Sequence, residues 1–123
     1  MIHSISKRME IAAAHRLELP YESKCRTLHG HNYIITVYLV ARDGLDANGM
    51  VFDFKHIKEK IQGYLDHGYL NDLLPFNTTA ENIAQWVVGQ FARCYKAVVQ
   101  ESEGNVAQAV DETKITGIEN LVM

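Results

Sequence analysis

The chain is organised around one short stretch, Cys25-Arg26-Thr27-Leu28-His29-Gly30-His31-Asn32-Tyr33. His29 and His31 open a β-branched and aromatic run that continues to Val40, which is typical of a strand. Alternate residues of a strand face the same side, so both imidazoles should point the same way. Two steps along a strand cover about 6.6 Å, a gap that two imidazoles can close around one metal ion. The motif therefore predicts a pair of metal ligands on one strand.

A third histidine, His15, lies upstream in a candidate strand from Glu10 to Leu19. If the two strands pair as an antiparallel hairpin, its imidazole reaches the same face as the other two. Three neutral imidazoles bind zinc at about 2.0 to 2.1 Å and leave one tetrahedral position open, as in catalytic zinc sites. Cys25 could close the site as a fourth, structural ligand, or it could be a thiol nucleophile or base beside the metal. Its spacing leaves both interpretations open.

The composition is typical of one soluble globular domain, with 123 residues, 47% hydrophobic and 22% charged. The net charge of -3 argues against a nucleic-acid partner, and no apolar run approaches the length of a membrane span. The first residues show no signal-peptide pattern, and two cysteines, Cys25 and Cys94, are too few for a disulfide framework. We therefore expect a cytoplasmic protein without membrane or nucleic-acid partners.

The middle of the chain predicts two helices. Asp53 can cap a helix over about Phe54 to Leu65, which carries an apolar stripe at i+4 spacing, and Gly68 is a natural stop. A second helix is expected after Thr78-Thr79-Ala80-Glu81, a capping box with Thr78 as N-cap and Glu81 at N3. This cap gives Glu81 a structural explanation, so any ligand role needs separate support.

Asp66 and His67 lie where the first of these helices should end. Such a pair is unremarkable as a surface feature. A reactive thiol, however, needs a neighbouring imidazole to share its proton, and a carboxylate orients that imidazole. We therefore treat Asp66 and His67 as candidate partners of Cys25.

The last third of the chain predicts a hairpin, with strands over residues 97–101 and 106–110 around a Gly-Asn turn. Glu101 ends the first of these strands. It could be a solvated edge carboxylate, or it could accept two hydrogen bonds from a 2-amino-pyrimidinone ring in a nearby pocket. Residues 111–123 follow without an evident partner, either as a tail or as an interface strand.

The expected order is thus two strands, two helices and two strands (ββααββ), an α+β fold with one antiparallel four-stranded sheet and helices on one face. Such a sheet leaves an exposed strand at each side. Because open edges must be covered, joining sheets between subunits is one solution.

These motifs, taken in order over about residues 5–110, resemble the superfamily of 6-pyruvoyl-tetrahydropterin synthases and 6-carboxytetrahydropterin synthases. The combination of the HGHNY and LDH elements is specific. The stretches that carry the resemblance are Ala13–Leu17, Cys25–Tyr33, Leu65–His67, Thr78–Asn82 and Gln100–Ser102.

The resemblance implies a tunnelling fold (T-fold), in which sheets from three subunits close a barrel and two trimers stack into a homohexamer. One T-fold domain would span 1–110, with 111–123 as a C-terminal extension. By the same resemblance, the zinc ligands correspond to His15, His29 and His31. Cys25 corresponds to the catalytic thiol, and its proton relay, Asp66 and His67, would come from a neighbouring subunit.

Glu101 matches the glutamate that anchors the pterin ring in this superfamily, and Thr79 and Glu81 match the segment that lines the pterin pocket. Gln and Ser flank Glu101 in place of the usual aromatic residue and threonine. Glu119 is therefore a rival for the same motif. Glu101 is preferred because a turn and a returning strand follow it.

The short gap between Cys25 and His29 resembles the bacterial 6-carboxy branch, as does the stretch Leu65–Asp72. This implies conversion of 7,8-dihydroneopterin triphosphate to 6-carboxy-5,6,7,8-tetrahydropterin with release of acetaldehyde and triphosphate, in the queuosine (7-deazapurine) pathway, with zinc and no redox cofactor. Alternatives are a 6-pyruvoyl or folate-pathway product, or a non-catalytic zinc protein. The nearby cations could meet the triphosphate or be ordinary surface charges: Arg16, Lys24 and Arg26.

Overall fold

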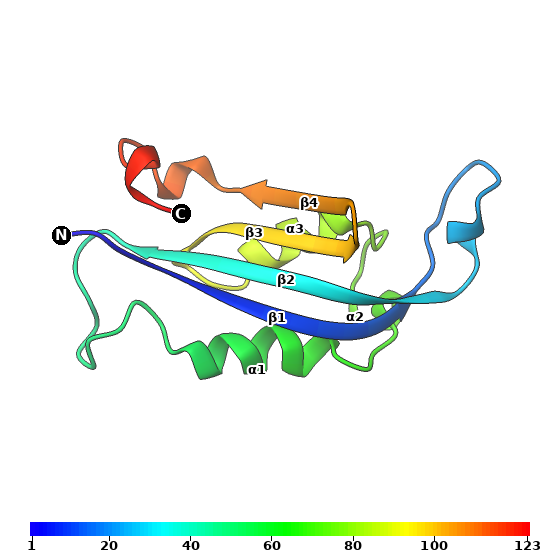
Figure 1. Cartoon of the computed structure of the whole chain (residues 1–123), viewed down its shortest axis with the longest axis horizontal. Coiled ribbons are helices and arrows are strands. Elements are labelled where there is room, and N and C mark those ends of the chain that lie inside the picture. Colours follow the sequence, from blue (N-terminus) through cyan, green and yellow to red (C-terminus); the bar gives the residue numbers. More distant parts are fainter.

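Four antiparallel strands form one sheet in the order β1-β2-β3-β4, in a computed structural model that describes residues 1–123 (Figure 1). The predicted α+β fold with one antiparallel four-stranded sheet is confirmed. The strands are β1 (His3–His15), β2 (His29–Ala41), β3 (Cys94–Ser102) and β4 (Asn105–Val110).

The first strand differs in extent from the prediction of Glu10 to Leu19, because β1 begins at His3 and ends at His15. Its whole length pairs with β2, from His3 opposite Ala41 to His15 opposite His29. The N-terminal part of β1 is rich in polar residues, which hid it in the sequence. Pairing with the long apolar β2 makes that part a strand.

Three helices join the two halves of the sheet, one more than predicted: α1 (Phe54–Leu65), α2 (Leu70–Leu73) and α3 (Ala80–Val88). Asp53 caps α1 as expected, by accepting a hydrogen bond from the Lys55 amide. The predicted cap of α3 is wrong by one residue. Thr79, not Thr78, is the N-cap and accepts from Asn82, so Glu81 is not at N3.

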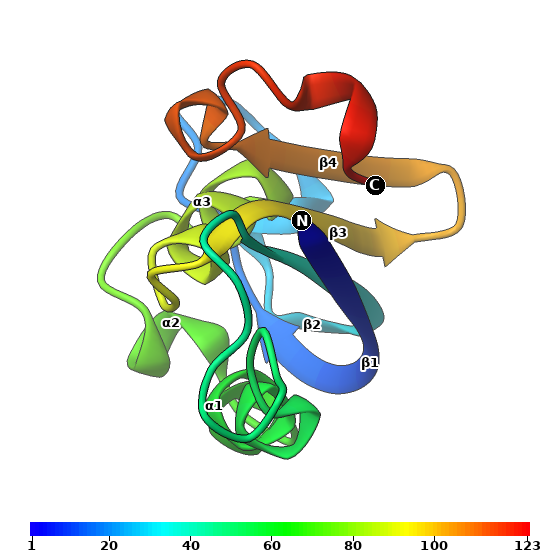
Figure 2. The same cartoon turned by 90° about the vertical axis from the view of Figure 1, so that its left-hand side faces the viewer.

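The core lies between the sheet and the helices, which share one side of the curved sheet in the end view (Figure 2). Alternate side chains of β1 and β2, such as Ile11 and Ile35, meet the predicted stripe of α1, Ile57, Ile61 and Leu65. Burial of this stripe, rather than helix propensity, is what stabilises α1.

Residues 111–123 form neither a free tail nor a strand. They fold into two short 3-10 helices, and Ile115 and Ile118 pack against Val40 and Tyr95 in a second small core. The Tyr95 hydroxyl donates to the Met123 carbonyl at 2.8 Å, which fixes the end of the segment.

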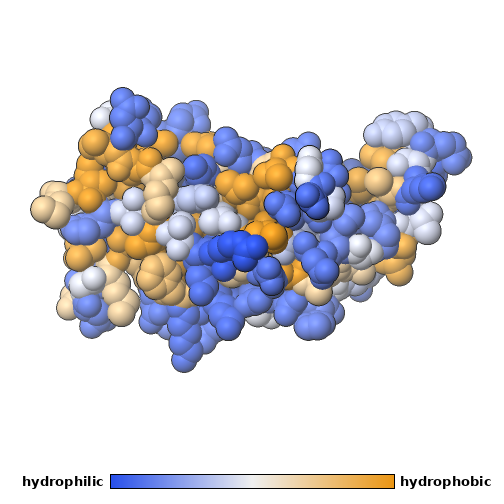
Figure 3. Space-filling view, viewed as in Figure 1, coloured by the Kyte–Doolittle hydropathy of each residue, from blue (hydrophilic) through white to orange (hydrophobic).

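Hydrophobic side chains gather at the end of the molecule that carries both termini, on the face shown in Figure 3. None of the helices combines the length and the apolar character needed to cross a membrane.

Candidate functional site

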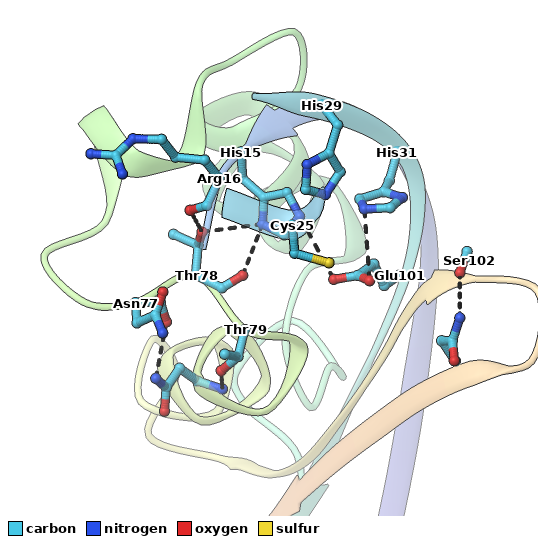
Figure 4. A network of polar contacts seen from close by, with 12 residues as sticks. His15, Arg16, Cys25, His29, His31, Asn77, Thr78, Thr79, Glu101 and Ser102 are labelled. Carbon is cyan, nitrogen blue, oxygen red and sulfur yellow. Dashed lines mark hydrogen bonds and ion pairs between the residues drawn. The ribbon is translucent and has the colours of Figure 1, made fainter. Parts of the chain in front are cut away.

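Three histidines converge at the end of the sheet where β1 ends and β2 begins (Figure 4). His15 pairs directly with His29, and Ala13 pairs with His31, so all three rings emerge on the same face. One ring nitrogen from each lies within 4.8 Å of the others, and the ring centroids are 4.6 to 5.1 Å apart. The sheet register alone therefore brings together the three predicted metal ligands.

Hydrogen bonds select which nitrogen His15 and His29 present. His15 Nδ1 lies 3.0 Å from the Thr78 carbonyl, and His29 Nδ1 lies 2.7 Å from the Thr27 carbonyl. A carbonyl oxygen can only accept, so the proton of each neutral ring is on Nδ1 and the Nε2 lone pair is free. Nε2 of His15 and of His31 is buried and has no hydrogen-bond partner. Such orphaned lone pairs on one face fit a divalent cation such as zinc.

Burial favours the neutral, ligand form of two of these rings. Desolvation lowers the pKa of His15, opposed in part by the Thr78 hydrogen bond and reinforced by His29. Desolvation also lowers the pKa of His31. Since only a neutral imidazole can coordinate a metal, the site is prepared for binding near neutral pH.

Glu101 enters the site from β3. Its two carboxylate oxygens lie 3.7 Å from Nε2 of His15 and of His31, respectively (Figure 4). These distances are too long for hydrogen bonds, and neutral rings make no salt bridge with a carboxylate. The carboxylate therefore stands free beside the histidines, available to a ligand.

An open pocket of about 660 Å³ adjoins the histidines and contains four of the predicted site residues, Cys25, Thr79, Glu81 and Glu101. Its remaining walls come from the loop after β1 and from β4. The volume lies in the range of small-molecule sites, about 300 to 1,000 Å³. The predicted thiol, the two predicted carboxylates and Thr79, which caps α3, thus line one cavity next to the three histidines.

Asp66 and His67 do not line this pocket. Asp66 accepts from the Ala12 amide at 2.9 Å, and the His67 amide donates to the Ala12 carbonyl at 2.7 Å, which places both on the outer edge of β1. His67 has φ 60°, a left-handed conformation that is strained for a non-glycine residue. Its side chain is 86% exposed, with Nε2 3.6 Å from Asp66. Within one chain, the imidazole is presented to solvent.

The rival glutamate, Glu119, lies in the C-terminal segment, where its carboxylate accepts from the Gly117 amide at 3.1 Å. Hydrogen bonds from its own backbone amide and from the Gly117 amide lower the pKa of Glu119. The structure therefore brings Glu101, and not Glu119, to the histidines.

The three flanking cations, Arg16, Lys24 and Arg26, do not line the pocket that contains Cys25. Arg16 pairs loosely with Glu18 at 3.7 Å, and Arg26 with Glu22 at 3.9 Å.

Sequence reasoning missed Thr78 as a site residue. Thr78 is fully buried, and both its carbonyl and its hydroxyl contact His15. The available signal was the pair of adjacent threonines, since only one of them can cap α3.

The fold and the site define a class: an α+β protein with three converging histidines that could hold a metal ion, beside an open pocket that contains a thiol and a carboxylate. Residues 4–113 match the family model described as 6-pyruvoyl tetrahydropterin synthase, and the chain belongs to this family. The resemblance inferred from the motifs is confirmed.

Two relatives carry the name of the 6-carboxy branch of the superfamily. The chain is 41% identical over 104 residues to 6-carboxy-5,6,7,8-tetrahydropterin synthase of Synechocystis sp., covering 77% of each chain. It is 37% identical over 117 residues to a putative 6-carboxy-5,6,7,8-tetrahydropterin synthase of Pyrococcus abyssi, covering 68% of this chain and 73% of the relative. These names agree with the predicted bacterial 6-carboxy branch.

A solved structure, that of Caenorhabditis elegans 6-pyruvoyl tetrahydropterin synthase, has a TM-score of 0.71 at 25% identity, covering 90% of this chain and 96% of that one. The T-fold predicted from the motifs is therefore confirmed.

Proposed function

We propose that this protein is a zinc-dependent lyase that converts 7,8-dihydroneopterin triphosphate to 6-carboxy-5,6,7,8-tetrahydropterin, with release of acetaldehyde and triphosphate. The observation that carries the proposal is the convergence of three histidines beside a pocket that contains both Cys25 and Glu101. The names of the Synechocystis and Pyrococcus relatives support the 6-carboxy branch. In this proposal, the enzyme works in the cytoplasm and its product enters queuosine biosynthesis.

His15, His29 and His31 would hold the zinc ion through Nε2. A zinc ion bound there would act as a Lewis acid and polarise the hydroxyls of the substrate side chain. Glu101 accepts hydrogen bonds from the 2-amino-pyrimidinone part of the pterin and so fixes the ring in the pocket, with Thr79 and Glu81 on the pocket wall.

Cys25 is the residue that moves protons at the side-chain carbons of the bound substrate. A thiol needs an imidazole to share its proton, and none of the three histidines is free if they hold the metal. His67, oriented by Asp66, is the candidate for this role. Because both residues lie on the outer edge of β1, they would reach the pocket of another subunit.

The pattern of open strand edges supports such an arrangement. From Glu10 to Glu18 the outer edge of the chain is covered by its own segment 62–77, including the Gln62 side chain on the Glu10 carbonyl at 2.7 Å and the Gly68 carbonyl on the Ala14 amide at 3.0 Å. Residues 3–8 of β1 and the outer side of β4 have no such backbone partner. Two complementary open edges remain.

Antiparallel pairing of β4 with residues 3–8 of another copy would continue the alternation of the sheet. The Asn105 end of β4, which lines the pocket, would then lie next to Glu10 of the neighbour, close to where Asp66 and His67 hold Ala12. We propose that three subunits joined in this way close a barrel, and that two such trimers stack into a homohexamer with sites between subunits.

Incubation of the purified protein with 7,8-dihydroneopterin triphosphate tests the proposal. Mass spectrometry should detect 6-carboxy-5,6,7,8-tetrahydropterin together with acetaldehyde. A 6-pyruvoyl product would assign the chain to the other branch, and absence of any conversion by the zinc-loaded protein would contradict an enzymatic role.

A further inference from the structure

We infer that two adjacent residues, Asn77 and Thr78, are the positioning residues of the active site: Thr78 sets His15 for the metal, and Asn77 sets the loop that carries Cys25. The inference rests on the proposed function and deepens it. Both residues lie in the segment that enters α3, where Thr79 caps the helix and the Asn77 carbonyl accepts from Asn82 at 2.9 Å (Figure 4). The helix thus anchors the pair.

Thr78 contacts His15 through two of its atoms. Its carbonyl lies 3.0 Å and its hydroxyl 3.1 Å from His15 Nδ1, and neither residue is exposed to solvent. The hydroxyl also lies 3.4 Å from the Arg16 carbonyl, to which it can donate. With its hydrogen directed to Arg16, the hydroxyl accepts from Nδ1, as the carbonyl does. Thr78 therefore holds the ring in the tautomer and orientation that present Nε2 to the metal.

The carboxamide of Asn77 makes a pair of hydrogen bonds with the backbone of Glu18, as a neighbouring strand would. Its Oδ1 accepts from the Glu18 amide at 3.0 Å, and its Nδ2 donates to the Glu18 carbonyl at 3.1 Å. Leu17, which precedes Glu18 in the chain, donates its amide hydrogen to the Cys25 carbonyl at 2.7 Å. Leu17 and Cys25 line the same pocket. Asn77 thus fixes Glu18 and, next to it, Leu17, to which the Cys25 backbone is hydrogen-bonded.

Asn71 provides an internal comparison for Asn77. Its carboxamide makes the same two bonds to Arg16, at 2.9 and 2.8 Å. Arg16 directly follows His15 and is already held by the end of β1. Removal of the Asn71 amide should therefore disturb the Cys25 loop less than removal of the Asn77 amide.

The metal part of the inference is tested without substrate. Thr78→Val keeps the shape and the carbonyl but removes the hydroxyl, and we expect zinc affinity, measured by chelator competition, to fall about tenfold. Thr78→Ser should restore it to within about twofold of the wild type, and Asn77→Ala should retain it. Zinc affinity of Thr78→Val equal to that of the wild type would overturn this part.

Nitrogen-15 NMR of the wild-type protein gives a second readout that needs no variant to fold. The metal-free protein should show His15 with its proton on Nδ1. A proton on Nε2 would overturn the assignment of Thr78 as the residue that selects the tautomer.

The thiol part is tested in the zinc-loaded protein. We expect Asn77→Ala to change the rate of Cys25 alkylation by iodoacetamide and to lower kcat about tenfold with zinc affinity retained, because misplacement by about 1 Å can cost about 100-fold in rate. Asn71→Ala should affect both quantities less. Unchanged alkylation and kcat in Asn77→Ala, or equal effects of both variants, would overturn it. Zinc affinity, tautomer and alkylation are independent of the product, so failure of the proposed reaction would be seen separately.

Discussion

Replacement of Glu101 by glutamine is the sharpest test of the proposed pterin pocket, and Glu119→Gln is its matched control. Glu101 is 23% exposed and lies in the pocket with Cys25, whereas Glu119 is a surface residue bonded to the Gly117 amide. A carboxylate can accept both donors of a 2-amino-pyrimidinone ring. A carboxamide accepts one and turns its own N–H groups toward the other.

The magnitude follows from the one bond that the carboxamide cannot accept. A hydrogen bond to a charged group contributes about 1.5 to 3 kcal/mol, so its loss corresponds to about 1.5 to 3 kcal/mol. At about 1.4 kcal/mol per factor of ten, kcat/KM for 7,8-dihydroneopterin triphosphate should fall by about 10- to 100-fold. Glu119→Gln should stay within about twofold of the wild type.

Steady-state kinetics with mass-spectrometric detection of the product measures this effect. Zinc content should be determined in parallel, because the three histidines remain and the metal should be retained in both variants. Undiminished kcat/KM in Glu101→Gln, or a loss in Glu119→Gln of the size expected for Glu101→Gln, would refute the assignment of the pterin anchor.

Three further predictions concern the metal, the thiol and pH. His29→Ala should lose both bound zinc and turnover, as measured by metal analysis and product formation, and an active metal-free variant would contradict the zinc site. Cys25→Ala should retain zinc but lose about 10²- to 10⁴-fold in kcat; in the wild type, X-ray absorption should show no Zn–S shell near about 2.3 Å, since such a shell would make Cys25 a structural ligand. The pKa values of His15 and His31 are lowered in the folded chain, so just below the ordinary value of 6.5 the unfolded chain binds more protons than the folded one. The free energy of unfolding of the metal-free protein should therefore decrease as pH falls from 6.5 toward the lowered values. Denaturant titrations between pH 7 and pH 5 would measure this free energy, and an increase in it as pH falls would show that these rings are not kept neutral by burial.

Local patterns in the sequence predicted much of this protein. The i+4 stripe of α1 and its Asp53 cap are short-range features, and the structure reproduces both. The alternation in the HGHNY stretch placed His29 and His31 on one face of a strand, because a strand has a period of two residues whatever it pairs with. The specific motifs also predicted the family.

Other features depended on contacts between distant residues. The start of β1 at His3 follows from its pairing with Ala41, at the far end of β2, and its polar residues gave no periodic apolar signal. The choice between two neighbouring threonines for the cap of α3 follows from burial of Thr78 against His15.

Short-range propensity and the period of each element therefore determine, from the amino-acid order alone, that the HGHNY stretch opens a strand, that residues 54–65 form a helix, and which side chains of each share a face. The placement of Glu101 beside His15 and His31, the exclusion of Glu119, and the exposure of His67 at the edge of β1 come from the three-dimensional packing. They depend on which strands pair and which surfaces are buried, and these are properties of the whole folded chain.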